Sequence, residues 1–177
     1  MEIDKKILAT LNLFGNTIVD KSKKNLKQKV STGGLIDSIK YKANINNNGF
    51  SVYFEMEDYW TFVNYGVQGK GGTKADGSSW ERKRVTNSKY KYKKAKPPIM
   101  AFNGWTIRKG IAPRNEKGQF TKRRGLLFAI ATSVFHTGLE TTSFFTKPFE
   151  KEFKELPDKL EKAYSFEVEE YLKFTIQ

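Results

Sequence analysis

Basic and aromatic side chains are interleaved in one stretch of the sequence, between residues 80 and 94. Its candidate contact residues are Trp80, Arg82, Lys83, Arg84, Tyr90, Lys91, Tyr92, Lys93 and Lys94. Lysine and arginine neutralise phosphates, while tyrosine and tryptophan stack on bases or pack against a neighbouring protein. We interpret these residues as a surface that contacts a partner, in preference to a solvated loop, because three large aromatic side chains need something to cover them.

The acidic residues give a weaker signal. Glu55, Glu57 and Asp58 cluster at the end of a predicted strand, where carboxylates could hold metal ions for a small nuclease. Two-metal hydrolysis needs carboxylates that converge from separate elements, which a local cluster does not supply. We therefore predict that the protein is not an enzyme and has no catalytic residues, no metal site and no cofactor.

Cysteine and histidine narrow the chemistry further. The chain has no cysteine and one histidine, His136, which excludes disulfides, thiolate catalysis and sites built from several imidazoles. His136 lies near the C-terminal end of a predicted helix, where it favours the helix dipole or packs partly buried.

Length and charge limit the function classes. The chain has 177 residues and a formal net charge of +13. Residues 148–177 contain eight acidic residues and five lysines. Their net charge is therefore −3, and that of residues 1–147 is +16. This asymmetry suggests two surfaces with different partners, one of them a polyanion, although a solvated lysine-rich surface explains it equally well. No apolar run is long enough to span a membrane and no signal peptide is evident, so we expect a soluble, reducing setting without membrane contact.

The elements that must position these residues indicate an α+β fold. Apolar spacing predicts a long amphipathic helix over 3–28, and alternation predicts an antiparallel hairpin over 36–56 that packs against this helix and others. A short helix follows at 58–66. Residues 67–96 then form a long basic loop with ten basic and two acidic residues between positions 70 and 96.

The second half of the chain is predicted to be mainly helical. A helix opens at Pro97-Pro98, a second basic loop covers 111–122, and a further helix covers 123–137. Residues 139–146 could add one more strand, and helical segments follow Pro148 and Pro157. We divide the chain into a domain of residues 1–147, with 67–96 as an inserted basic arm, and an acidic helical extension of residues 148–177.

Four segments, in order, resemble the tail-completion or neck (head–tail joining) proteins of tailed bacteriophages. They are TGGLIDSI at 32–39, YWTFVNYG at 59–66, PPIMAFNGWTIRKGI at 97–111 and LLFAIATSVFHTGLETTSFF at 126–145. The order matches over roughly residues 1–155. The long loop 67–96 and the acidic C-terminal helix depart from the family pattern.

The resemblance implies a non-enzymatic structural protein of the virion, assembled in the host bacterial cytoplasm. It would form a homo-oligomeric ring of six or twelve copies in the head–tail connector. There it would join portal-side and tail-side proteins around the DNA channel and touch packaged DNA non-specifically. The alternative is a free nucleic-acid-binding protein that uses residues 70–96 as its binding arm.

Two structural expectations can be checked directly. Phe54 should be largely buried under a helix, and Trp105 should be largely buried on the core face of its own helix. The glycines at the start of the basic loop should form a flexible hinge, so that the loop orders only against neighbouring subunits: Gly66, Gly69, Gly71 and Gly72.

Overall fold

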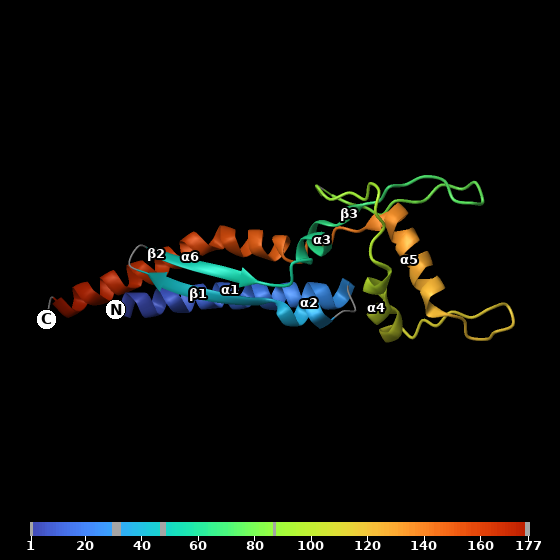
Figure 1. The fold of residues 1–177 in the computed structure, drawn as a ribbon. Helices are drawn as coiled ribbons and strands as arrows, with labels where there is room; N and C mark the ends of the chain where they lie inside the picture. Colours follow the sequence, from blue (N-terminus) through green and yellow to red (C-terminus); the bar gives the residue numbers. More distant parts are fainter. Residues whose placement is uncertain (1, 30–32, 47–48, 87, 176–177) are drawn as a thin grey trace. The chain divides into compact units, whose positions relative to one another are not determined.

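A computed structural model gives the fold. It describes residues 2–29, 33–46, 49–86 and 88–175, with side chains over 4–27, 33–46, 49–86 and 88–165. The chain forms two units (Figure 1). The first contains Met1–Gln28, Gly33–Glu57 and Phe144–Gln177, and the second contains Lys29–Thr32 and Asp58–Ser143. This division differs from the predicted boundary at residue 148, because the C-terminal segment belongs to the same unit as the N-terminal helix.

The first unit combines two long helices with a two-stranded sheet, which confirms the predicted α+β class. The helices are α1 (Glu2–Lys29) and α6 (Thr146–Thr175). Their shared core contains Leu11, Phe14 and Ile18 of α1 and Leu156 of α6. Half-buried aromatic rings extend this core with edge-on contacts, among them Phe14 to Phe54 at 6.3 Å between centroids.

The predicted hairpin is present, as β1 (Lys40–Asn46) paired antiparallel with β2 (Gly49–Glu55). The register places Tyr41 opposite Phe54 and Ala43 opposite Val52. Because side chains alternate along a strand, these residues share one face, and Ala43, Val52 and Phe54 pack against the helical core. The turn residues 47–48 lie outside the described residues.

The predicted start of the hairpin at residue 36 is wrong, because residues before the strand form a short helix, α2 (Gly33–Ser38). Leu35 and Ile39 are buried, and the Ser38 hydroxyl donates to the Leu35 carbonyl at 2.9 Å. The same hydroxyl accepts a hydrogen bond from the Glu57 amide at 3.2 Å. Ser38 therefore joins the start of the hairpin to its end.

The two predicted helical segments after Pro148 and Pro157 are instead one continuous helix, α6, with Pro157 inside it. Proline removes one intrahelical hydrogen bond, a cost that normally ends a helix. Here Leu156 is buried and Leu160 packs against the same core. The helix is thus held on both sides of the proline by tertiary packing.

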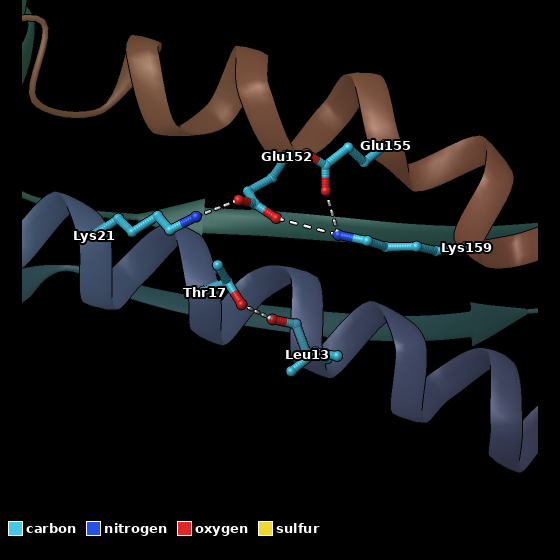
Figure 2. A network of polar contacts seen from close by, with 6 residues as sticks. All are labelled: Leu13, Thr17, Lys21, Glu152, Glu155 and Lys159. Carbon is cyan, nitrogen blue, oxygen red and sulfur yellow. Dashed lines mark hydrogen bonds and ion pairs between the residues drawn. The ribbon is translucent and has the colours of Figure 1, made fainter.

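A polar network fixes α1 to α6 across the edge of this core (Figure 2). Lys21 of α1 donates to Glu152 of α6, whose side chain is only 6% exposed. Lys159 lies 3.4 Å from the other Glu152 oxygen and 2.8 Å from Glu155. The hydrogen bond from Lys21 is the main reason that the pKa of Glu152 lies below its ordinary value.

The second unit contains three α-helices, a short 3₁₀ helix and two very short strands among its described residues. They are α3 (Trp60–Tyr65), β3 (Val67–Gln68), η1 (Ile99–Phe102), α4 (Asn103–Arg108), α5 (Arg123–Thr137) and β4 (Gly138–Leu139). Leu127, Ala131 and Phe135 form the buried face of α5. The predicted helices over 58–66, from Pro97 and over 123–137 are therefore present.

The predicted strand over 139–146 is reduced to β4, which pairs with β3 in a second sheet and not with the hairpin. Beyond Leu139, isolated backbone bonds, such as that from the Ser143 amide to the Asn64 carbonyl at 2.9 Å, and side-chain hydroxyls take the place of a regular strand ladder. Thr141 donates to the Tyr65 carbonyl at 2.8 Å, and Thr142 donates to the Val63 carbonyl at 2.6 Å. Local side-chain bonding of this kind competes with regular pairing.

As predicted, most of the surface of Phe54 and of Trp105 is covered, although neither residue is fully buried. In α4 the buried position is Thr106, one residue further along the helix. Over the described residues, no helix has both the length and the apolar character that crossing a bilayer requires.

Candidate functional site

The net charge of the protein resides in the second unit. Residues 58–143 contain 17 Lys and Arg against five Asp and Glu, a net charge of +12. The segments of the first unit contain 14 of each kind and are neutral. A sequence boundary at residue 148 hides this separation, because the acidic C-terminal segment folds with the basic N-terminal helix.

The basic loop 67–96 is tied to the C-terminal end of α5 by backbone hydrogen bonds. The amides of Lys70 and Lys83 donate to the carbonyls of Phe135 and Thr137, at 2.9 and 2.8 Å. Further along, the Gln68 amide donates to the Tyr90 carbonyl and the Tyr92 amide donates to the Gln68 carbonyl, both at 2.9 Å. Each end of the loop is thereby anchored within the second unit.

The three aromatic residues of the predicted contact surface lie against partners in the same unit. Trp80 stacks on His136 with ring centroids 5.0 Å apart. Tyr90 meets Phe62 edge-on at 4.6 Å, and Tyr92 packs against Phe135 at 5.9 Å. Burial raises the pKa of the Tyr92 hydroxyl above its ordinary value. Part of each ring is therefore covered without a second molecule.

The six cations of the same set are all exposed: Arg82, Lys83, Arg84, Lys91, Lys93 and Lys94. Alternation explains the segregation over residues 90–93, where tyrosines face the protein and lysines face solvent. The Arg82 guanidinium also donates to the Lys70 carbonyl at 3.0 Å, which holds one cation against the loop backbone. The six cations are thus accessible to solvent, whereas much of the surface of the three aromatic rings is covered.

The predicted glycine hinge is wrong for the first part of the loop. Gly66, Gly69 and Gly71 are buried. A Cβ at Gly69 would overlap the His136 carbonyl oxygen, so glycine is needed there for close backbone packing. Gly72 is exposed with φ +109°.

Other cations of this unit lie over aromatic rings. The Lys70 ammonium is 5.6 Å from the Phe135 ring centroid, and the Lys74 ammonium is 5.4 Å from that of Trp80. Lys96 lies 4.5 Å from the Phe128 ring and also donates to the Thr132 hydroxyl at 3.0 Å. Such contacts orient lysine side chains while leaving their charge at the surface.

The tip of loop 67–96 is a tight turn. Asp76 accepts hydrogen bonds from the amide and the hydroxyl of Ser78, at 2.9 and 2.6 Å. These bonds hold the pKa of the Asp76 carboxyl below its ordinary value. A bridge between Thr73 and Ser79 closes the turn, so the tip has a defined geometry.

The second basic loop, residues 111–122, forms a similar turn that the sequence interpretation missed. Arg114 and Phe120 form an antiparallel bridge, and the Asn115 side chain accepts from the amides of Lys117 and Gln119. The Arg114 guanidinium lies 4.1 Å from the Phe120 ring centroid, and that side chain is 68% exposed. The pairing of Asn115 with Gly118 was the available sequence signal for a turn.

The acidic cluster weighed as a nuclease centre has no structural support as a metal site. Glu55, Glu57 and Asp58 are all exposed. Within the described ranges, no three His, Asp or Glu side chains form a group that could hold a metal ion.

The arrangement can therefore attract and hold a polyanion through exposed cations on ordered loops. Comparison with protein-family models, with curated proteins and with solved structures found no match for this chain.

Proposed function

We propose that the protein is a structural component of the head–tail connector of a tailed bacteriophage virion. In this proposal several copies form a ring around the DNA channel, the second units carry the cationic surface toward DNA, and the first units contact neighbouring connector, portal or tail proteins. The chain assembles in the cytoplasm of the host bacterium.

The observation that carries the proposal is the separation of charge between the two units. A net charge of +12 on residues 58–143, beside a neutral first unit, suits a subunit with one surface for a polyanion and another for protein. Cations on a channel wall neutralise passing phosphates without reading sequence.

The state of the aromatic residues favours this role over a free nucleic-acid-binding protein. Base stacking requires exposed ring faces, but Trp80 stacks on His136 and Tyr90 packs against Phe62. The remaining chemistry is mainly charge, which suits a surface that DNA passes and does not suit base readout.

Segments of the phage resemblance have structural roles in the fold. Gly66 approaches the backbone around Leu139, and Leu127 and Phe135 are core residues. The loop 67–96, which departs from the family pattern, carries much of the exposed cationic surface. The proposal takes the connector role from this resemblance and the DNA-facing role from the charge.

Two matched triple variants test the DNA contact. One replaces Lys91, Lys93 and Lys94 with Gln, and the other replaces Lys5, Lys24 and Lys27 of α1 with Gln. All six lysines are exposed, so each variant loses the same charge from a solvent-accessible surface. The loop variant should bind duplex DNA more weakly, with a shallower salt dependence by about 0.9 per lost phosphate contact, and the α1 variant should match the wild type. Equal effects would contradict a DNA-facing second unit.

Localisation in purified particles tests the connector role itself. A tagged copy should be found between head and tail by electron microscopy, and its mass in solution or in the particle should correspond to a ring. A protein absent from purified particles, yet able to bind DNA as a monomer or dimer, would favour the nucleic-acid-binding alternative.

A further inference from the structure

The exposed face of α6 carries an apolar stripe beside the core. Phe153 and Tyr164 are 54% and 55% exposed, and Pro157 is also exposed. At 100° per residue, these three positions fall within about 40° of one another around the helix. Phe153 stacks on Phe149 at 5.5 Å, so the stripe continues directly into the packed core.

The stripe has an acidic border. Going around the helix away from the core, the exposed residues Glu150 and Glu161 come next after the stripe. Lys154 comes after these two carboxylates. An apolar strip bordered by carboxylates fits a partner that presents an aromatic side chain next to a cation.

The turn at 111–122 presents such a pair. Phe120 is 68% exposed, and Arg114 lies over its ring at 4.1 Å. Arg114 also donates to the Gly118 carbonyl at 2.9 Å, and the Asn115 side chain bonds to the Gln119 amide at 2.8 Å. The aromatic ring and its cation are thus held in place before any partner binds, which lowers the entropic cost of docking.

We propose that the Phe120–Arg114 turn of one copy docks on the α6 stripe of a second copy. Phe120 would pack on Phe153 and Tyr164, while Arg114 and Lys117 would face Glu150 and Glu161. The inference rests on the proposed ring function in taking the partner to be another copy of this chain. Complementary charge and the matched apolar residues on the two units support that choice.

This contact uses different surfaces on its two sides, so it is head-to-tail. Each copy has one turn and one stripe, and repetition gives a closed ring or an open filament. A self-complementary dimer would leave no free surface for a third copy. The inference therefore specifies how the proposed ring would be joined.

Mixing two defective variants gives a direct test. Phe120→Asp removes the turn surface and keeps the stripe, and Phe153→Asp does the reverse. Each variant alone should self-associate at least about 30-fold more weakly than the wild type in sedimentation velocity. Mixed together, they should form a 1:1 complex with twice the 20.4 kDa chain mass and nothing larger.

Exposed apolar residues elsewhere supply matched controls. Met100→Asp in the second unit and Leu13→Asp on α1 alter side chains that are 65% and 64% exposed. Both should assemble like the wild type. Circular dichroism and thermal melting should show that all four variants are folded, since each changed side chain is at the surface.

Charge reversal provides a second measurement that does not depend on removing an aromatic ring. Arg114→Glu with Lys117→Glu should prevent assembly, and Glu150→Lys with Glu161→Lys should do the same. Combining all four changes in one chain should restore assembly, because the opposite charges meet again.

Several results would overturn the inference. They are a monomeric wild type at the highest soluble concentration, assembly of either aspartate variant at wild-type strength, or a mixture that stays monomeric. These outcomes leave the connector role open to the particle-localisation test. Conversely, a 1:1 complex with no protein in virions would support the contact and reject the connector role.

Discussion

The indole ring of Trp80 lies flat on the imidazole of His136, with an 8° angle between their planes. The His136 Nδ1 atom is 2.6 Å from the Gly71 carbonyl oxygen, so the imidazole joins the end of α5 to the loop backbone as well as to the indole. Phe135 meets the same imidazole edge-on at 5.0 Å. One histidine thereby connects a core aromatic residue with the cationic loop.

Replacing Trp80 with Ala should loosen the basic loop without unfolding the unit. We expect the free energy of unfolding to fall by about 1–3 kcal/mol. This is less than for a fully buried tryptophan, because Trp80 is only half-buried. Hydrogen exchange should accelerate at the amides of Lys70, Gly71 and Lys83, which bond to the end of α5. Met100→Ala, at a 65% exposed position in the same unit, is the control. Unchanged exchange in the Trp80 variant would mean that the stack does not hold the loop.

Glu152 should make the first unit sensitive to acid. Its pKa is lowered in the folded state, mainly by the hydrogen bond from Lys21. The stabilisation is therefore complete above the unfolded value of about 4.5, and it is lost as pH falls through the lower folded value. At pH 7, Glu152→Gln should cost about 1–2 kcal/mol, an amount limited by the 45% exposure of Lys21.

The pH dependence of stability should distinguish the effect of Glu152 from that of Glu155. Helical circular dichroism should show the difference between wild type and Glu152→Gln shrinking toward about pH 3. Glu155 forms an exposed i,i+4 pair with Lys159, so Glu155→Gln should cost less than about 0.5 kcal/mol. A Glu152→Gln effect that stays constant from pH 7 to 3 would contradict the assigned ion pair.

Gly69 and Gly125 should respond in opposite ways to alanine. A methyl group at Gly69 would overlap the backbone of His136 and Thr137. Unlike a flexible side chain, this backbone cannot move away. We expect a loss of about 3 kcal/mol or more. At Gly125, in the first turn of α5, a Cβ meets nothing within 4 Å, so alanine should stabilise by up to about 1 kcal/mol.

Tryptophan fluorescence can report this pair of substitutions. All three tryptophans, Trp60, Trp80 and Trp105, lie in the second unit. Denaturant titration followed by their emission therefore measures the unit that contains both glycines. Similar midpoints for the two alanine variants would show that the backbone at Gly69 is less closely packed than described.

Phe54 should contribute more to the stability of the first unit than Tyr53, its neighbour on the same strand. Its ring makes edge-on contacts with three others, including Phe145 at 5.2 Å and Phe149 at 6.1 Å. Phe54→Ala should cost about 2–3 kcal/mol, below the value for complete burial. Tyr53 is 57% exposed, so Tyr53→Ala should change stability by less than about 1 kcal/mol in thermal melts. Equal losses would mean that the strand faces are exchanged.

Local patterns in the sequence predicted most of the regular elements. The apolar spacing around Leu11 and Ile18 predicted α1, and alternation around Phe54 predicted the hairpin. These patterns work because helix and strand periods differ. Where tertiary contacts dominate, the same reasoning failed. Pro157 was assigned to a helix start, but packing of Leu156 and Leu160 keeps it inside α6.

The sequence predicted which residues form the candidate surface, but it did not predict how their side chains are arranged. Charges such as Lys91 and Lys93 are exposed as expected for a contact surface, but the partners of the aromatic residues were not foreseeable. Trp80 and His136 are 56 positions apart, and no local period relates them. Gly15 in α1 shows the same limit, because nothing local in the sequence predicts that the ring of Tyr41 fills the space beside it.

The order of segments along the chain also determines when each unit can form during translation. The second unit is almost entirely one continuous stretch, residues 58–143, whereas the first also needs α6. At typical elongation rates, α1 and the hairpin wait roughly 4–17 s for that stretch to be made. During this interval the apolar face of Leu11, Phe14 and Ile18 lacks its cover from α6. On the ribosome, the apolar residues of α1 and the hairpin therefore wait longer for their packing partners than those of the second unit, which prolongs their exposure to solvent.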